Sequence, residues 1–151
     1  MSDNEQRLLM LIDEEPAQSR LVASSAAREG WRTLLIREPG SAITMLTRRE
    51  DNDPGAVCLD LSIAGDDGPV IIAELRSRRP TMPIIVIVDR SRSGRCIEAL
   101  RAGATDYLIK PVAPDSLIQA LRSAAQRPSW GDELAPRSEG ASCRERVFIL
   151  V

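Results

Sequence analysis

The stretch GAVCLDL, residues 55–61, is an apolar run interrupted by one carboxylate, that of Asp60. A run that is apolar at nearly every position is typical of a parallel strand buried on both faces, because a half-buried strand alternates apolar and polar residues. An acid inside such a run needs a partner, since an unpaired buried charge is costly. Residues 55–61 therefore predict a central strand whose carboxylate belongs to a larger group of charges.

The chain on either side of this run alternates between two patterns. Further short apolar runs, predicted to be strands, cover residues 7–12, 32–36, 82–88 and 105–109. Amphipathic stretches, predicted to be helices, cover residues 16–29, 40–50, 68–79, 91–102 and 114–127. Strand and helix alternate five times, which predicts an α/β fold with a parallel sheet and right-handed crossovers. The arginines that end the third predicted helix, Arg76, Arg78 and Arg79, are expected to be solvated.

The length and the polar stretches set the expected domain organisation. The 151 residues, 43% of them hydrophobic, fit one globular domain. We assign residues 1–127 to this domain and residues 128–151 to a polar linker with a short apolar C-terminal tail. The tail, CRERVFILV, is compatible with the start of an output domain that has been cut short.

Composition excludes several classes of function. The net charge of −2 predicts no nucleic-acid binding by this chain. The absence of histidine excludes Ser-His-Asp and Cys-His hydrolases and His-ligated zinc sites. The three cysteines, Cys58, Cys96 and Cys143, have no metal-binding spacing and suit a reducing compartment. With no membrane-spanning run and no signal-peptide pattern, we expect a cytoplasmic protein.

Charged residues follow three of the predicted strands. Asp13 and Glu14 follow the first, Asp60 ends the third, and Lys110, the one lysine among 20 basic residues, follows the fifth. Function in parallel sheets gathers at the carboxyl ends of the strands. Carboxylates about 4 Å apart repel by roughly 4 kcal/mol at an effective dielectric of 20, so a cation must lie nearby. Lys110 supplies one charge, and Mg²⁺ prefers such oxygen ligands. Helix capping accounts equally well for one of the acids after the first strand.

Three motifs make the pattern specific. LIDEEP (11–16), LDLSIAGDDG (59–68) and GATDYLIKP (103–111) occur in this order. Over residues 7–127 the chain resembles the receiver domain of two-component response regulators. The resemblance implies a doubly wound, flavodoxin-like (βα)5 fold, with a five-stranded parallel sheet in the order 2-1-3-4-5 and helices on both faces.

The resemblance also implies a function and its residues. Asp60 is the expected acceptor of a phosphoryl group from a sensor histidine kinase or phosphotransfer protein, and Lys110 is expected to reach this group from the end of a neighbouring strand. The switch aromatic is Tyr107, and the Lys110–Pro111 bond is expected to be cis. The implied Mg²⁺ ligands are Asp13, Glu14, Asp60 and the backbone carbonyl of Ser62. Such a domain is a signalling module that catalyses no more than its own phosphorylation and dephosphorylation. It works with an output domain or partner protein and forms homodimers in some cases.

The chain departs from the family pattern after the fourth strand. Val88 replaces the usual Thr or Ser, Asp89 follows where a small residue is usual, and Ala64 replaces a loop proline. Valine has the shape of threonine but donates no hydrogen bond, so we expect retained phosphorylation with atypical switching. Neutral drift in a working receiver is an alternative reading of Val88. Another is a pseudo-receiver, an interaction module that signals without phosphorylation. A Mg²⁺-dependent hydrolase would need an acid at Ser62 and is disfavoured.

Overall fold

The protein is described from a computed structural model. The structure describes residues 7–48 and 53–126. The predicted linker and tail, residues 128–151, lie outside the described residues, so their assignment stays a prediction.

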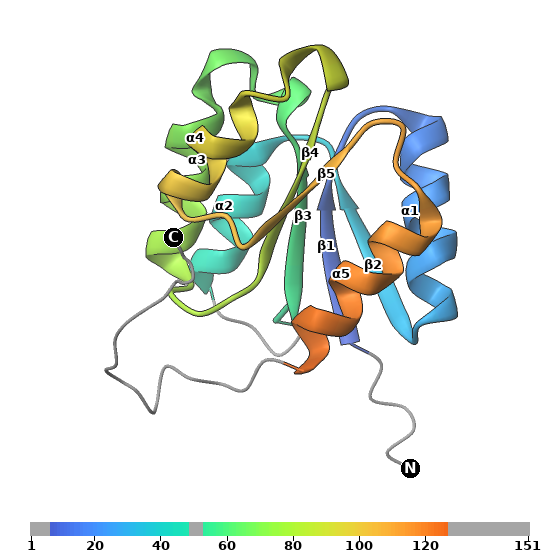
Figure 1. Cartoon of the computed structure of the whole chain (residues 1–151). Helices are drawn as coiled ribbons and strands as arrows, with labels where there is room; N and C mark the ends of the chain where they lie inside the picture. The colour runs from blue at the N-terminus through green and yellow to red at the C-terminus, as the bar shows by residue number, and fades with distance from the viewer. Residues whose placement is uncertain (1–6, 49–52, 127–151) are drawn as a thin grey trace.

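The five predicted strands form one parallel sheet (Figure 1). Its strands are β1 (Arg7–Ile12), β2 (Trp31–Ile36), β3 (Ala56–Asp60), β4 (Ile84–Val88) and β5 (Asp106–Ile109). They are arranged in the order β2-β1-β3-β4-β5, and all four pairings are parallel. The predicted fold class and strand order are therefore confirmed, and β2 and β5 are the edge strands.

Helices cover both faces of the sheet. They are α1 (Pro16–Arg28), α2 (Pro39–Arg48), α3 (Gly68–Arg78), α4 (Arg95–Ala102) and α5 (Pro114–Gln126). Helices α1 and α5 lie together on one face, and α2, α3 and α4 lie on the other (Figure 1). Pro16 occupies the first turn of α1, where its missing N–H costs nothing.

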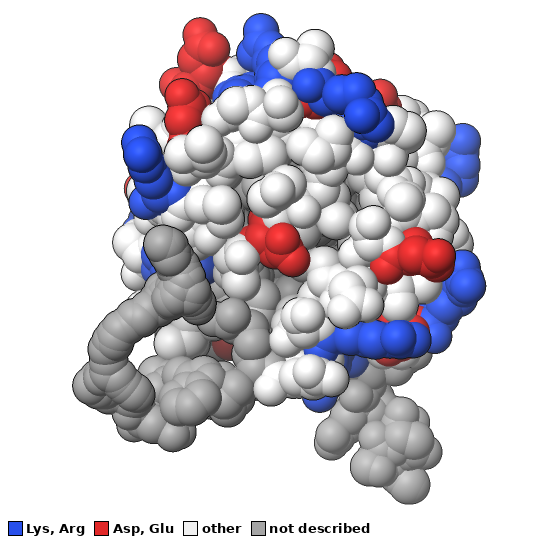
Figure 2. Space-filling view, viewed as in Figure 1, with Lys and Arg blue, Asp and Glu red and all other residues white. Residues whose placement is uncertain are grey.

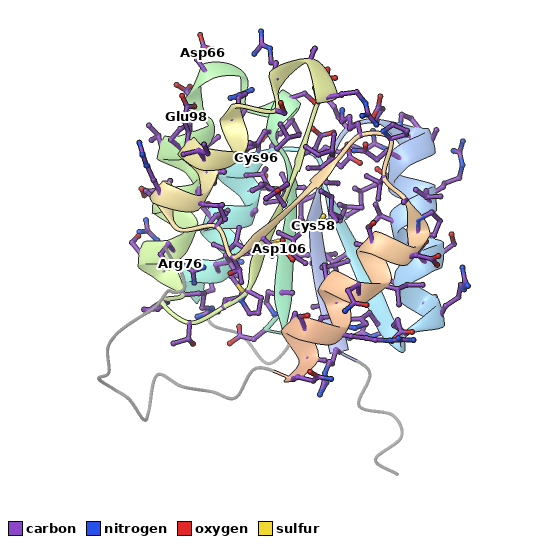
Figure 3. All side chains as sticks on the ribbon, viewed as in Figure 1. Cys58, Asp66, Arg76, Cys96, Glu98 and Asp106 are labelled. Atoms are coloured by element: carbon purple, nitrogen blue, oxygen red, sulfur yellow. The ribbon has the colours of Figure 1, made fainter. Side chains whose placement is uncertain are left out.

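The two faces of the sheet explain why the central strands are apolar throughout. Every residue of β3 and β4 is buried. Val57 and Leu59 pack in the layer beneath α2, α3 and α4, whereas Ala56 and Cys58 pack in the layer beneath α1 and α5. Figure 3 shows the Cys58 side chain inside the molecule. Alternate residues thus enter opposite layers, as expected for strands covered on both faces.

The segment after β4 differs from the prediction. A helix was expected from residue 91, but Arg90–Arg92 form a short 3₁₀ turn, and α4 begins at Arg95. The turn closes when the backbone N–H of Arg92 donates to the Asp89 carbonyl at 2.8 Å. The serines and glycine at 91, 93 and 94 favour such turns over a helix interior, and the apolar periodicity starts only after them.

The arginines at the end of α3 also differ from the prediction. Arg76 donates hydrogen bonds to the carbonyls of Gly103 and Met82, and Arg79 is 7% exposed and pairs with Asp53 at 2.6 Å. The expectation that these two side chains are solvated was wrong, because both bind partners that are distant in sequence. None of the helices in the described part of the chain combines the length and the apolarity needed to cross a lipid bilayer.

Candidate functional site

The sheet register brings the charged strand ends to one level. Asp60 of β3 pairs with Ile87 of β4, and Val88 pairs with Ile109 of β5. The backbone N–H of Lys110 then donates to the Val88 carbonyl at 2.9 Å, which fixes the start of the lysine beside the end of β4. The carboxyl ends of β1, β3 and β5 therefore form one site, as the sequence predicted.

Asp60 is the buried centre of this site, with 2% of its surface exposed. Its Oδ1 accepts from the Ser62 amide at 2.9 Å and from the Ser62 hydroxyl at 2.6 Å. Its Oδ2 accepts from Gln18 Nε2 at 2.6 Å and lies 3.0 Å from Lys110 Nζ. Burial alone would raise the pKa of Asp60, but the bonds from Ser62, Lys110 and Gln18 outweigh burial and lower it. Asp60 is thus held as a carboxylate despite its burial.

Lys110 connects three side chains. Its Nζ lies 3.0 Å from Asp60 Oδ2 and 3.5 Å from Glu15 Oε1, and it donates to the Ser62 hydroxyl at 3.3 Å. Burial acts to lower the pKa of Lys110, but the bond to Asp60 and the charges of Asp60 and Glu15 raise it. The lysine reaches Asp60 across β4, so the prediction of a neighbouring strand was wrong: β5 is two strands from β3. The Lys110–Pro111 peptide bond is cis, as the resemblance implied.

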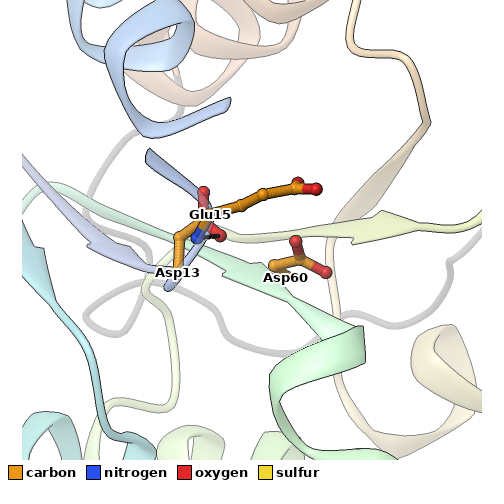
Figure 4. A group of neighbouring side chains, drawn as sticks. All are labelled: Asp13, Glu15 and Asp60. Atoms are coloured by element: carbon orange, nitrogen blue, oxygen red, sulfur yellow. Dashed lines mark hydrogen bonds between the residues drawn. The ribbon is translucent and has the colours of Figure 1, made fainter. Parts of the chain in front are cut away.

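The two acids that Lys110 contacts, Asp60 and Glu15, form a group of three carboxylates with Asp13 (Figure 4). The carboxylate oxygens of Asp13, Glu15 and Asp60 lie within 4.8 Å of one another. Asp13 is 1% exposed, and it accepts from the Glu15 backbone N–H at 3.0 Å and from the Ser19 hydroxyl at 3.1 Å. Glu14, the predicted ligand, is exposed and is not a member of this cluster. Hard carboxylate oxygens at this spacing fit Mg²⁺, which seldom takes all its ligands from protein.

Gln18 belongs to the site but was missed from the sequence. Its amide nitrogen donates to Oδ2 of Asp13 at 3.1 Å and to Oδ2 of Asp60 at 2.6 Å. A signal exists in the sequence: with Pro16 as the first residue of α1, Gln18 is the third, in the turn directly after the acids. An amide carries no charge, so the pattern of charged residues at the strand ends does not indicate it.

The predicted switch residues occupy opposite environments. Val88 is 1% exposed at the end of β4, and Asp89 is exposed just beyond it. Tyr107 is 42% exposed on the edge strand β5. The structure therefore places an apolar side chain where the family pattern has a hydroxyl, and places the aromatic on the outer surface.

Cys58 lies below the site without taking part in its chemistry. It is fully buried, and burial followed by the charges of Asp13 and Asp60 raises the pKa of its thiol far above the ordinary value. A thiol that stays protonated is a poor nucleophile, so Cys58 acts as a core residue, as its apolar surroundings suggest.

Known proteins share this fold and sequence pattern. The family model described as response regulator receiver domain matches residues 9–122. The alginate biosynthesis transcriptional regulatory protein AlgB of Pseudomonas putida is 33% identical over 116 residues, which cover 76% of this chain and 25% of AlgB. The receiver domain of NtrX from Brucella abortus is 28% identical with a TM-score of 0.70, covering 80% of this chain and 99% of that domain.

A further structure has the same fold with a metal in place. It is the receiver domain of a sensor histidine kinase from Pseudomonas aeruginosa, which has a magnesium ion coordinated in its active-site cleft. This domain is 22% identical with a TM-score of 0.67, and the match covers 80% of this chain and 99% of that domain. At this identity it shows the fold alone.

Together, the five-stranded sheet, the lysine-paired carboxylate and the family match define a signalling domain of the receiver type. The chain belongs to the family of response regulator receiver domains. It spans about a quarter of the length of AlgB and about half that of the regulator TcrX of Mycobacterium tuberculosis.

Proposed function

We propose that the chain accepts a phosphoryl group on Asp60 from the phosphohistidine of a sensor histidine kinase or phosphotransfer protein. The observation that carries this proposal is the state of Asp60: almost fully buried, yet held ionised by four hydrogen-bond donors including the lone lysine. A carboxylate kept charged at the carboxyl edge of a parallel sheet is suited to act as a nucleophile. The missing histidine agrees, because the phosphoryl donor must then lie outside these 151 residues.

The transfer exchanges one bond for another. A carboxylate oxygen of Asp60 attacks phosphorus, the P–N bond to the donor imidazole breaks, and the bonding electrons leave with that nitrogen. The product is an acyl phosphate on Asp60, and the ammonium of Lys110 pairs with a phosphoryl oxygen. Positioning and charge stabilisation account for most of the catalysis in such transfers.

Three acids against one lysine leave an excess of negative charge at the reacting centre. Asp13, Glu15 and Asp60 would hold Mg²⁺, with the Ser62 carbonyl and Glu14 as the further ligands that the family pattern implies. When bound, the ion neutralises charge on the transferring oxygens. Either Glu14 turns inward to bind the ion or Glu15 takes its place. The metal affinities of the Glu14→Gln and Glu15→Gln variants distinguish these two cases, because loss of the true ligand should weaken metal binding about tenfold.

The first experiment measures the intact mass of the protein after incubation with acetyl phosphate and Mg²⁺. We expect the mass of one phosphoryl group on the wild-type chain, and none on Asp60→Asn or after EDTA. Asp66→Asn is the matched control, because Asp66 is exposed in the loop between β3 and α3 and should leave phosphorylation unchanged.

Failure of the wild-type chain to gain mass calls for a second donor. Incubation with a phosphorylated histidine kinase and a time course at low temperature separate slow transfer or rapid hydrolysis from absent chemistry. If no phosphoryl group appears under any of these conditions, the relay function is wrong. The pseudo-receiver, a module that signals through constitutive contacts, then becomes the better description.

Val88 at the end of β4 determines how the domain is expected to respond to phosphorylation. Val88 has no hydroxyl that could be drawn toward a phosphoryl group. We therefore expect phosphorylation of Asp60 to couple only weakly to Tyr107 and to the surface around α4, β5 and α5. The Ser62 hydroxyl, 2.6 Å from Asp60 Oδ1, belongs to the turn after β3 and not to the end of β4, so it does not replace the missing hydroxyl there. We therefore expect a receiver that accepts phosphate but responds atypically.

The output surface that we propose lies around α4, β5 and α5. Ile97 and Leu100 of α4 and Tyr107 of β5 are exposed hydrophobic side chains. Figure 2 shows that much of this face is uncharged, with acidic atoms near its middle and most other charged side chains toward its rim. Such a face suits an output domain, a partner protein or a second copy of the chain. We expect the domain to act in the cytoplasm, where histidine kinases present their phosphoryl groups. Sedimentation of the chain with and without acetyl phosphate tests the homodimer.

A further inference from the structure

Gln18 makes contacts that the phosphoryl-transfer chemistry above does not use. It is the third residue of α1, directly above the ends of β1 and β3. Its Nε2 lies 2.6 Å from Oδ2 of Asp60 and 3.1 Å from Oδ2 of Asp13. One amide nitrogen therefore bridges two carboxylates that come from different strands.

The orientation of this amide follows from the charges around it. The nitrogen carries two hydrogens, and each of them has one carboxylate acceptor. Turning the amide over would place its carbonyl oxygen against two anionic oxygens with no hydrogen between them. The donor orientation is thus the one that the two acids select.

Each of the two oxygens that Gln18 bridges also contacts a second donor. Oδ2 of Asp60 also meets Lys110 Nζ at 3.0 Å, and Oδ2 of Asp13 also accepts from the Ser19 hydroxyl. The remaining oxygens, Oδ1 of Asp60 and Oδ1 of Asp13, accept from Ser62 and from the Glu15 backbone N–H. A divalent cation binds through the lone pairs of carboxylate oxygens, and a hydrogen-bond donor occupies the same lone pairs.

We propose that Gln18 competes with the divalent cation for Asp13 and Asp60 and thereby sets how much Mg²⁺ the domain needs before it can be phosphorylated. This inference rests on the proposed function, because it takes these acids as the Mg²⁺ site. The amide lessens the repulsion between the two carboxylates without adding charge. A cation that binds through these Oδ2 atoms displaces the amide, so Gln18 weakens metal binding while stabilising the acid pair.

The test replaces Gln18 by methionine, which keeps the length of the side chain and removes both donors. Affinity is measured by titrating the protein with Mn²⁺ and following the electron paramagnetic resonance signal of the free ion, with Mg²⁺ as competitor. We expect Gln18→Met to bind about tenfold more tightly than wild type, since hydrogen bonds to charged groups are typically worth more than neutral ones. Gln119→Met, on the exposed side of α5, is the matched control and should leave the affinity unchanged.

Each result has a distinct meaning. Equal affinities in wild type and Gln18→Met overturn the proposal, and so does weaker binding by Gln18→Met, which would make Gln18 a metal ligand through its oxygen. Asp60→Asn tests the underlying site separately: if it binds Mn²⁺ as tightly as wild type, the proposed metal site is wrong, whatever Gln18 does. Gln18→Ala also removes both donors but adds no methionine, and its thermal unfolding curve is recorded beside its affinity. Comparison of the two variants separates the loss of the donors from a packing effect of methionine.

Discussion

Lys110 Nζ lies 3.0 Å from Oδ2 of Asp60, although β4 separates the strands that carry them. The contact requires a long side chain with a compact charge, because the same ammonium also meets Glu15 and Ser62 within 3.5 Å. A planar guanidinium spreads its charge over a wider, rigid fork, so it cannot bring that charge as close to three oxygens that converge on one point. The one lysine of an arginine-rich chain is therefore explained by the shape of the site.

Lys110→Arg tests this relationship directly. We expect phosphorylation of Asp60 by acetyl phosphate to slow by about tenfold or more, because misplacing a group that meets the transferring oxygens is costly. The rate is followed by intact mass against time. Arg90→Lys, at an exposed position just after β4, is the matched exchange in the other direction and should leave the rate unchanged. A wild-type rate in Lys110→Arg would mean that any cation suffices at this position.

Val88→Thr tests the switch. The hydroxyl enters a position that is 1% exposed, so we expect a loss of roughly 1–2 kcal/mol in the free energy of unfolding. Because the threonine hydroxyl can donate to the phosphoryl group, phosphorylation should shift the nuclear magnetic resonance signals of Tyr107 more in this variant than in wild type. The chain has a single tyrosine, so selective labelling gives one unambiguous reporter. Val88→Ile keeps the position apolar and should show the wild-type response; equal shifts in all three proteins would argue for neutral drift at Val88.

Acid should remove the stabilisation that Asp60 provides. Its hydrogen bonds lower the pKa of the folded-state carboxyl, so the unfolded chain binds the proton more tightly. The contribution is complete above the unfolded-state value of about 4 and is lost as the pH falls through the lower pKa of the folded state. Urea unfolding of wild type and Asp60→Asn between pH 6 and pH 3 measures this. The wild-type chain should lose stability relative to Asp60→Asn below about pH 4; parallel curves would contradict the lowered pKa.

Asp106 should behave in the opposite sense. It lines a groove between β5 and α5, and burial raises the pKa of its carboxyl, although the Tyr107 backbone N–H donates to it at 2.8 Å. The folded state then binds the proton more tightly, so stability falls as the pH rises through the pKa of the folded state. Asp106→Asn keeps an acceptor for the Tyr107 N–H and should raise the thermal midpoint at pH 7 by a few degrees. The gain should vanish below about pH 4; a gain that persists there would mean that charge is not its cause.

Among the arginines at the end of α3, Arg76 is expected to contribute most to the stability of the fold. Figure 3 shows it on α3, and its guanidinium donates to the carbonyls of Arg79, Pro80, Met82 and Gly103. Arg76→Ala leaves these acceptors, three of them part-buried, without their donor, and we expect a loss of about 2–3 kcal/mol in the free energy of unfolding. Arg76→Lys should recover only part of it, since lysine has no fork.

The control for this prediction is Arg78→Ala in the same helix. Arg78 pairs with Glu74 one turn away at the surface, and such pairs contribute little. We expect a change below about 1 kcal/mol by urea unfolding. If Arg76→Ala lowers the free energy of unfolding no more than Arg78→Ala does, the contacts of Arg76 with the carbonyls do not contribute to stability.

The sequence predicted the fold well because burial on both faces leaves a continuous apolar pattern in β3 and β4. It also predicted that Asp13, Asp60 and Lys110 meet, because parallel strands bring their carboxyl ends to one edge. Three features escaped it for physical reasons. Gln18 carries no charge, and the choice between Glu14 and Glu15 depends on how the chain turns into α1. Arg76 and Arg79 lie in a charge-rich helix end whose partners are carbonyls and an acid distant in sequence.

Lys110 and Tyr107 belong to one short edge strand and its continuation, three residues apart, with the lysine at the reacting carboxylate and the tyrosine at the outer surface. If phosphorylation of Asp60 moves Lys110 and with it β5, a protein whose affinity depends on the position of β5 binds with different strengths before and after phosphorylation, and with Val88 in place we expect this difference to be small. By the reciprocity of coupled equilibria, that protein must shift the balance between phosphorylated and unphosphorylated Asp60 by the same factor. On the proposed function, the partner that reads the signal would thus also be an effector of the residue that receives it.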